Sequence, residues 1–127
     1  MDKITTRTVE AFIDETGILH IKVLAGVKID LDDAADNFLA FKQLRAGQRR
    51  LKLVDARSYW KSTKEARDYT LKEDIPERTI AKAILVSGII DLIIYSLLIK
   101  RHKSMIPIKL FLFEQKALKW LNSFREK

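Results

Sequence analysis

The chain has 127 residues, of which 47% are hydrophobic and 32% are charged. This length and composition are typical of one folded domain with its own core, and they exclude a disordered segment. The absence of cysteine excludes disulfides, thiol nucleophiles and thiolate metal ligands. The first twelve residues contain no apolar stretch of the kind found in secretory signals, so we expect a cytoplasmic protein.

The formal net charge of +7 is unevenly distributed along the chain. Residues 1–41 carry four basic and eight acidic side chains, whereas residues 42–127 carry twenty basic and nine acidic ones. Such asymmetry favours an acidic partner, an anionic membrane or nucleic acid through long-range attraction. A solvated surface of mixed sign explains the same distribution, and both interpretations stay open.

The first half of the chain predicts a β-hairpin, a helix and a short strand. Residues 6–13 alternate apolar and polar side chains, and the turn at 14–17 separates them from a second strand at 18–24. Asp30 is the predicted N-cap of a helix that Gly47 ends, and residues 51–54 form a strand that ends at Asp55. The predicted buried stripe of the helix consists of Leu31, Ala35, Phe38, Leu39, Phe41 and Lys42.

The second half predicts three helices and two strands. Ser62 and Glu65 form a predicted capping box for a mostly polar helix that runs to about Glu73. Residues 80–86 predict an interior strand, and 88–101 predict a largely buried apolar helix, in which the central Asp91 disfavours a membrane span. A strand at 108–113 precedes a C-terminal helix with a stripe of Ala117, Trp120, Leu121 and Phe124.

The predicted order is therefore β-β-α-β-α-β-α-β-α, in a single α/β domain that spans residues 1–127. Strands that alternate with helices favour right-handed crossovers and a mixed, mostly parallel sheet of five strands. The hairpin makes the first strand antiparallel to the second.

No residue pattern of an active site is present. The two histidines, His20 and His102, lie in no pattern that pairs them with an acid and a nucleophile, and no phosphate-binding glycine loop occurs. The aspartates in residues 30–36 lack the glycine and the closing glutamate of a calcium loop. The sequence therefore predicts a protein that is not an enzyme and that has no metal and no cofactor.

The segment between the third strand and the second helix is the first candidate binding site. Ligands of parallel α/β sheets gather at the carboxyl ends of strands, and a hydroxyl at a helix N-terminus is a favourable position for a phosphate. Alternatively Ser62 only caps the helix, and Tyr59 and Trp60 are either core anchors or a partner-binding surface. The candidate residues are Asp55, Arg57, Ser58, Tyr59, Trp60, Ser62, Thr63 and Arg67.

The third predicted helix is the second candidate, because it is more apolar than one sheet surface can cover. Its excess apolar surface meets either neighbouring helices, a second copy in a homodimer, or an apolar ligand. The candidate residues of this face are Ile90, Asp91, Ile94, Tyr95 and Leu98.

Two local patterns accompany the predicted order. Val54-Asp55 precedes a helix that starts Ser62-Thr63-Lys64-Glu65, and Phe111-Leu112-Phe113-Glu114 precedes the helix Ala117-Leu118-Lys119-Trp120-Leu121. Together with the order of the elements, they resemble the STAS superfamily, the SpoIIAA-like fold of bacterial anti-sigma-factor antagonists, and above all its uncharacterised STAS/SEC14-like branch. The resemblance implies a non-enzymatic regulatory module that binds a protein, with Ser62, or else Ser58, at the position of the phosphoacceptor.

Three functions follow as hypotheses. The first is a signalling module that binds a protein partner through the surface from Ser58 to Arg67, and homodimerisation through the third helix is compatible with it. The SEC14 side of the resemblance implies the second, a small carrier of a lipid or another apolar ligand. The third is nucleic-acid binding through a basic face of Arg45, Arg49, Arg50, Lys52, Lys100, Arg101 and Lys103.

Overall fold

The computed structural model describes residues 2–101 and 104–125, without the side chains of Leu98 and Arg101. Six strands form one mixed sheet in the order β1-β2-β3-β5-β7-β8, and two short strands form a second sheet. The strands of the large sheet are β1 (Lys3–Thr5), β2 (Val9–Ile13), β3 (Leu19–Val23), β5 (Arg50–Asp55), β7 (Thr79–Leu85) and β8 (Ile108–Phe111). The small sheet pairs β4 (Lys28–Ile29) with β6 (Lys61–Ser62) in parallel. The helices are α1 (Leu31–Arg45), α2 (Lys64–Thr70), α3 (Ile89–Arg101) and α4 (Glu114–Asn122).

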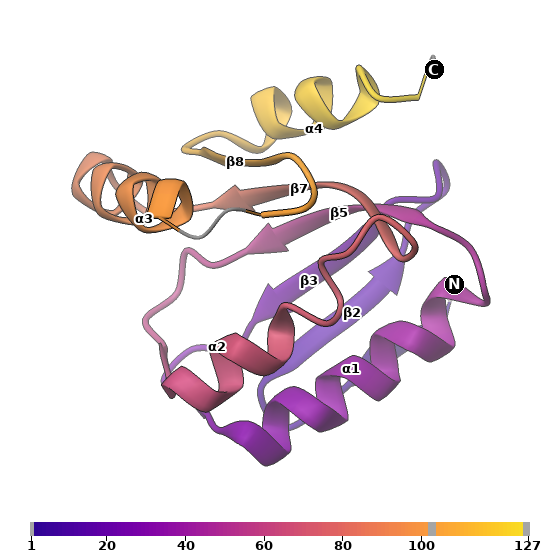
Figure 1. Cartoon of the computed structure of the whole chain (residues 1–127), viewed down its shortest axis with the longest axis horizontal. Helices are drawn as coiled ribbons and strands as arrows, with labels where there is room; N and C mark the ends of the chain where they lie inside the picture. The colour runs from indigo at the N-terminus through magenta and orange to yellow at the C-terminus, as the bar shows by residue number, and fades with distance from the viewer. Residues whose placement is uncertain (1, 102–103, 126–127) are drawn as a thin grey trace.

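The predicted α/β class with four helices and a mixed sheet is confirmed. β1, β2 and β3 are antiparallel, and β3, β5, β7 and β8 run parallel to one another. The large sheet has one strand more than predicted because residues 3–5 pair with β2. In Figure 1, α1 and α2 lie on one side of the sheet, α4 lies on the other, and α3 lies near the end at which β5 and β7 point.

One half of the core lies between α1 and the antiparallel part of the sheet. Its buried residues are Val9, Ala11, Leu19, Ile21, Ala40 and Phe41. Of the predicted stripe of α1, Phe41 is buried, but Leu31 and Leu39 were wrong, since they are 46% and 62% exposed. The buried face instead includes Asn37 and Arg45, whose side chains bond to Thr8 and Glu73. A stripe defined by apolar residues alone misses such positions.

The other half of the core lies between α4 and the parallel strands. Ala117 and Leu121 of α4 are fully buried there, and Trp120 and Phe124 pack against them as predicted. The buried residues of the strand side are Ile18, Leu51, Leu53, Ala81, Ala83 and Leu85. Alternation along β5 and β7 puts the buried apolar residues of these two strands on one face and Lys52 and Lys82 on the other.

Charged side chains are buried where α1, β5 and β7 meet the segment that follows α2. Helix α2 ends at Thr70 and not near Glu73, because the next residues turn inward and bring Glu73 and Asp74 into the core. Arg45 binds Glu73 with two hydrogen bonds of 2.8 and 3.0 Å. The Asp74 carboxylate accepts hydrogen bonds from Lys52 (2.9 Å) and Lys82 (2.8 Å).

Candidate functional site

The loop that follows β5, residues 56–63, is fixed to the segment that follows β3. Four hydrogen bonds with donor–acceptor distances of 2.7–3.0 Å join the two segments. They run from Ser58 Oγ to the Val23 carbonyl, from Gly26 N to the Tyr59 carbonyl, from Lys61 N to the Val27 carbonyl, and from Thr63 N to the Ile29 carbonyl. The loop is therefore a pre-formed surface, anchored along its whole length.

The three candidate hydroxyls of this segment have different partners. Ser58 donates to the Val23 carbonyl at 2.8 Å, and Thr63 accepts from the Ala66 backbone N–H at 3.1 Å. The predicted capping box at Ser62 was wrong: Ser62 pairs with Ile29 in the small sheet, so the chain enters α2 one residue later and Thr63 is the N-cap. The half-buried Ser62 hydroxyl accepts from Arg67 Nη1 at 3.2 Å.

Tyr59 and Trp60 are adjacent but differ in their surroundings. Trp60 is half-buried, and its indole N–H donates to the Ala56 carbonyl at 3.2 Å, so it anchors the loop. Tyr59 is 68% exposed, and the Lys61 ammonium lies 6.0 Å from the centre of its ring. The sequence left an anchor and a surface residue as alternatives for this pair; Trp60 anchors the loop, whereas Tyr59 is exposed.

Asp55 ends β5 and is held by Arg57. Two guanidinium hydrogen bonds, each 2.9 Å long, bind the two oxygens of the carboxylate. These hydrogen bonds keep the pKa of Asp55 below its usual value. An ionised carboxylate accepts hydrogen bonds but has no proton to donate, so Asp55 is suited to holding the loop and not to general acid catalysis.

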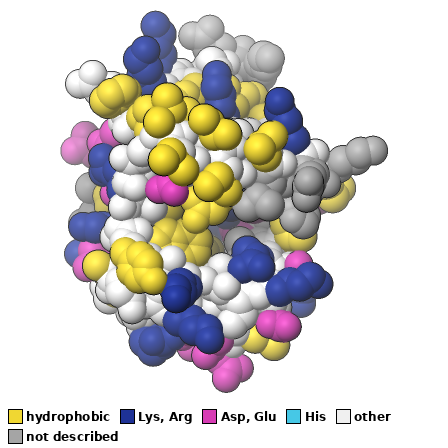
Figure 2. Space-filling model, turned by 90° about the vertical axis from the view of Figure 1, so that its left-hand side faces the viewer, with side chains coloured by type: hydrophobic (Ala, Val, Ile, Leu, Met, Phe, Trp, Pro, Cys, Tyr) yellow, Lys and Arg dark blue, Asp and Glu magenta, His cyan; other side chains and the backbone are white. Residues whose placement is uncertain are grey.

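The third helix is not covered as predicted. Figure 2 shows hydrophobic side chains gathered over α3, with lysine and arginine side chains around them. α3 contacts β8 on one side, and the sheet does not reach its opposite side. Five of its aliphatic side chains are at least half exposed, namely Ile89, Ile90, Ile93, Ile94 and Leu97.

Among the other candidates on α3, Tyr95 is also exposed, whereas Asp91 is half-buried and accepts a hydrogen bond from Ser87 at 3.0 Å. The Leu98 side chain lies outside the described part of the structure. The fold brings the two candidate sites to the same end of the sheet, because Asp55 and Leu85 are register partners at the ends of β5 and β7.

The proposed basic face is not formed as predicted. Arg45 and Lys52 are buried in ion pairs with Glu73 and Asp74 and are absent from the surface. Lys103 and the Arg101 side chain lie outside the described residues. The pattern of basic residues therefore does not define one continuous surface, because sequence spacing does not distinguish exposed from internally paired cations.

His20 pairs with an aspartate, and no hydroxyl hydrogen-bonds to its ring among the described residues. His20 Nε2 lies 2.7 Å from Asp14 Oδ2, and the His20 ring stacks on Phe12 at 4.7 Å between ring centres. His102 lies outside the described residues. Within residues 2–101 and 104–125, no cluster of three metal-ligating side chains occurs. In the same part of the chain, no helix combines the length and hydrophobicity that crossing a membrane requires.

Two features of this molecule were not predicted from its sequence. One is the buried ion cluster around Asp74, whose members come from α1, β5, β7 and the segment after α2. The other is a pocket beside Arg50, on the α1 side of the sheet. A lysine in each of two apolar strands, Lys52 and Lys82, was the one available signal of the ion cluster.

Comparison with solved structures shows the fold that this arrangement belongs to. An uncharacterised protein of the DUF3478 family with a SpoIIAA-like fold, from Shewanella loihica PV-4, aligns with a TM-score of 0.69 and 17% sequence identity. The alignment covers 95% of this chain and 98% of that protein. A protein of unknown function from Arthrobacter sp. FB24 aligns at 21% identity over 93% of this chain and 95% of that protein. Its TM-score of 0.31 is too low to indicate a shared fold.

The predicted resemblance to the SpoIIAA-like fold is thereby confirmed at the level of the fold. No curated protein matches the sequence. A family match extends over residues 12–125 and so includes both candidate sites. The chain belongs to the family described as a domain of unknown function, DUF7793.

Proposed function

We propose that this protein is a non-catalytic module that binds a protein partner through residues 55–67. The observation that carries the proposal is the 68% exposure of Tyr59 on a loop fixed by four hydrogen bonds. Tyrosine, tryptophan and arginine supply most of the binding energy at protein interfaces, and a pre-formed loop has little conformational entropy to lose on binding. Tyr59 is then the anchor, with Trp60 fixing the loop beneath it.

The charges around Tyr59 indicate the character of the partner surface. Arg57 and Lys64 are paired with Asp55 and Asp68, whereas Lys61 lies over the Tyr59 ring and is exposed. An aromatic side chain beside an exposed ammonium favours a partner with an apolar pocket and an acidic rim. The positive net charge of residues 42–127 favours the approach of such a surface.

A phosphorylation switch in this module would act at Ser62. The hydroxyls of Ser58 and Thr63 bond to the backbone, where they hold the loop and cap α2. Ser62 contacts a side chain, and its neighbour Arg67 is a natural partner for a phosphate, because a guanidinium pairs well with phosphate oxygens. Phosphate at Ser62 would add negative charge close to Tyr59 and weaken the attraction of an acidic partner.

Site-specific photocrosslinking in the native host tests the binding surface. A photoreactive phenylalanine analogue replaces Tyr59 in one strain and Leu39 in a control strain, since Leu39 is 62% exposed on α1, on another part of the molecule. We expect one protein to be crosslinked at position 59 and not at position 39. The affinity of that protein for purified Tyr59→Ala should fall roughly tenfold or more.

Two outcomes would overturn this proposal. The first is an equal crosslinking pattern at positions 59 and 39, and the second is an unchanged affinity after Tyr59→Ala.

Intact mass spectrometry of the protein from the same host tests the phosphorylation switch separately. An added phosphate that persists in Ser62→Ala would remove Ser62 as its site.

A further inference from the structure

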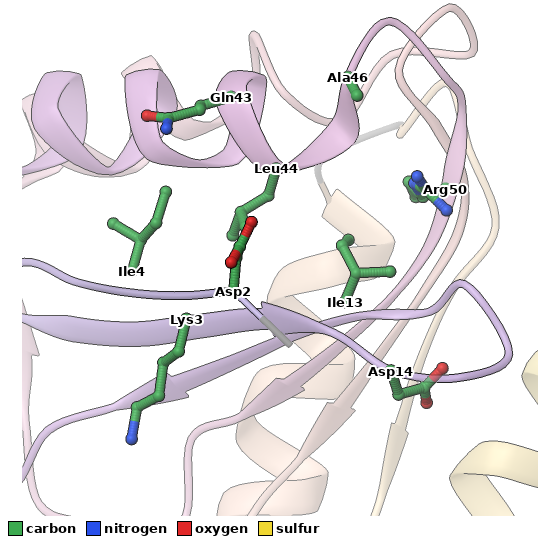
Figure 3. Close-up of a pocket in the computed structure, with 9 residues that line it drawn as sticks. All are labelled: Asp2, Lys3, Ile4, Ile13, Asp14, Gln43, Leu44, Ala46 and Arg50. Atoms are coloured by element: carbon green, nitrogen blue, oxygen red, sulfur yellow. The ribbon is translucent and has the colours of Figure 1, made fainter.

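A pocket of about 690 Å³ opens between the C-terminal half of α1 and the strands β1 and β2 (Figure 3). Ile4 and Ile13 rise from the strands towards Leu44 of α1, and these three side chains form its apolar lining. They continue the hydrophobic cluster that α1 covers. The volume lies within the range of roughly 300–1,000 Å³ that is typical of small-molecule sites.

Arg50 lies at one end of this pocket with hydrogen-bonding capacity that the protein leaves unused. Its Nη1 donates to the Gly17 carbonyl at 3.3 Å, but its buried Nε has no partner among the described residues. Asp14 also lines the pocket, yet it already accepts hydrogen bonds from Thr16 and Ile18 and contacts His20. Because Nε is closed to solvent, a molecule in the pocket reaches the guanidinium only through its terminal nitrogens.

The backbone beside Arg50 leaves room for the guanidinium. Gly17 has φ +90°, and a Cβ atom at this position would lie 3.1 Å from Arg50 Nη1. A side chain on residue 17 would therefore be strained and would crowd the guanidinium. The hairpin turn thus keeps Arg50 at the end of the apolar lining.

We propose that this pocket binds a small amphipathic carboxylic acid. Its carboxylate accepts hydrogen bonds from the terminal N–H groups of Arg50, and its apolar body lies on Ile4, Ile13 and Leu44. Guanidinium and carboxylate match in geometry, because two parallel N–H donors meet two oxygens. Asp2 and Asp14 also line the pocket and repel an anion, and this repulsion is smaller for the single charge of a carboxylate than for the double charge of phosphate. This site is separate from residues 55–67 and does not depend on the proposed protein partner.

Calorimetric titration of the full-length protein with octanoate, methyl octanoate and inorganic phosphate tests the site. We expect saturable binding of octanoate, with the neutral ester and phosphate each weaker by roughly tenfold or more. Arg50→Met should lower the affinity for octanoate to that of the wild type for the ester. Methyl NMR spectra should show octanoate shifting signals of Ile4, Ile13 and Leu44.

Arg49→Met is the matched control. Arg49 neighbours Arg50 and is exposed, but it donates to the Pro76 carbonyl and does not line the pocket. The Arg49→Met variant should bind octanoate as tightly as the wild type does, and so should the Tyr59→Ala variant. Binding of the ester or of phosphate as tight as that of octanoate would overturn the proposal. The absence of saturable octanoate binding would also overturn it, and so would a normal affinity for octanoate in a folded Arg50→Met variant. The comparison of octanoate with its ester needs only the wild type, so it tests the proposal even if Arg50→Met does not fold.

Discussion

At the scale of single residues, Asp74 is the centre of the ion cluster in the core. Its carboxylate lies between the ammonium groups of Lys52 and Lys82, and Lys52 and Asp74 are almost completely buried. Burial lowers the pKa of Lys52. Burial acts to raise the pKa of Asp74, but the attraction of Lys82 and Lys52 outweighs it and keeps that pKa below its usual value.

Removing Asp74 and removing Lys52 should therefore have unequal effects. Asp74→Asn leaves the half-buried Lys82 ammonium without its carboxylate partner and the buried Lys52 ammonium with only Glu73, 4.0 Å away, so we expect the free energy of unfolding to fall by about 3–5 kcal/mol. Lys52→Met should have a smaller effect, because Asp74 keeps Lys82 as its partner. Urea unfolding, followed by the fluorescence of Trp60 and Trp120, measures the loss of stability in both variants. A loss from Lys52→Met as large as that from Asp74→Asn would contradict this account.

Asp33 makes the stability depend on pH in the acid range. The hydrogen bond from Arg7 is the main cause that lowers the pKa of Asp33 from 3.8 to about 2. A carboxyl with a lowered pKa stabilises the fold above its unfolded pKa, and this contribution is lost as the pH falls through the folded value. Asp33→Asn should thus be less stable than the wild type at pH 7. The difference should shrink between about pH 4 and pH 2.

Urea unfolding of both proteins at several pH values measures this difference. A matched control is Asp36→Asn, because Asp36 is exposed on the same helix. The control should follow the wild type through the whole pH range. A difference between Asp33→Asn and the wild type that stays constant from pH 7 to pH 2 would show that the Arg7–Asp33 pair does not act through its charge.

At the scale of elements, the start of α2 distinguishes two neighbouring hydroxyls. Thr63 caps the helix through the Ala66 N–H, whereas Ser62 contacts the Arg67 side chain. Thr63→Ala should lower the free energy of unfolding by about 1 kcal/mol, the usual effect of losing an N-cap. Ser62→Ala should change it by less than about 0.5 kcal/mol, because it removes only a contact with the exposed Arg67 side chain. Equal losses in thermal or urea unfolding would contradict the assignment of the cap.

The same junction shows how far the sequence determines the elements. Alternation and apolar runs predicted β2, β3, β5, β7 and β8, because these patterns are local. The cap of α2 was misplaced because Ser62 pairs with Ile29 of β4, a contact between segments distant in sequence. The buried face of α1 was misplaced for a similar reason, since the partners of Asn37 and Arg45 lie on other elements.

The candidate sites were predictable to different degrees. The carboxyl end of a strand is a general location for ligands, so the order of the elements was enough to select residues 55–67 as a candidate. The separate roles of Tyr59 and Trp60 depend on hydrogen bonds to the segment after β3, which no local pattern reveals. The pocket beside Arg50 combines residues of β1, β2, β5, the hairpin turn and α1, so no local pattern in the sequence reveals it.

At the scale of the whole molecule, an exposed apolar helix and a net positive charge have opposite effects on association. Large apolar patches on soluble proteins favour contacts with other molecules, and α3 exposes five aliphatic side chains at half or more of their surface. The formal charge of +7 makes two copies repel each other, and salt screens this repulsion. Self-association through α3 should therefore strengthen as the salt concentration rises, whereas binding of an acidic partner near Tyr59 should weaken.

Light scattering coupled to size exclusion measures this balance. We expect the mass of the wild type to exceed the 14.7 kDa of one chain at high protein concentration, and more so at high salt. Ile90→Glu with Ile94→Glu should stay at the mass of one chain, because charges on the exposed face disfavour its burial. Both residues are at least half exposed, so the double variant should unfold at nearly the same urea concentration as the wild type. The matched control is Leu39→Glu on α1, which should associate as the wild type does. A wild type that keeps the mass of one chain at every concentration and salt level would show that α3 does not mediate self-association.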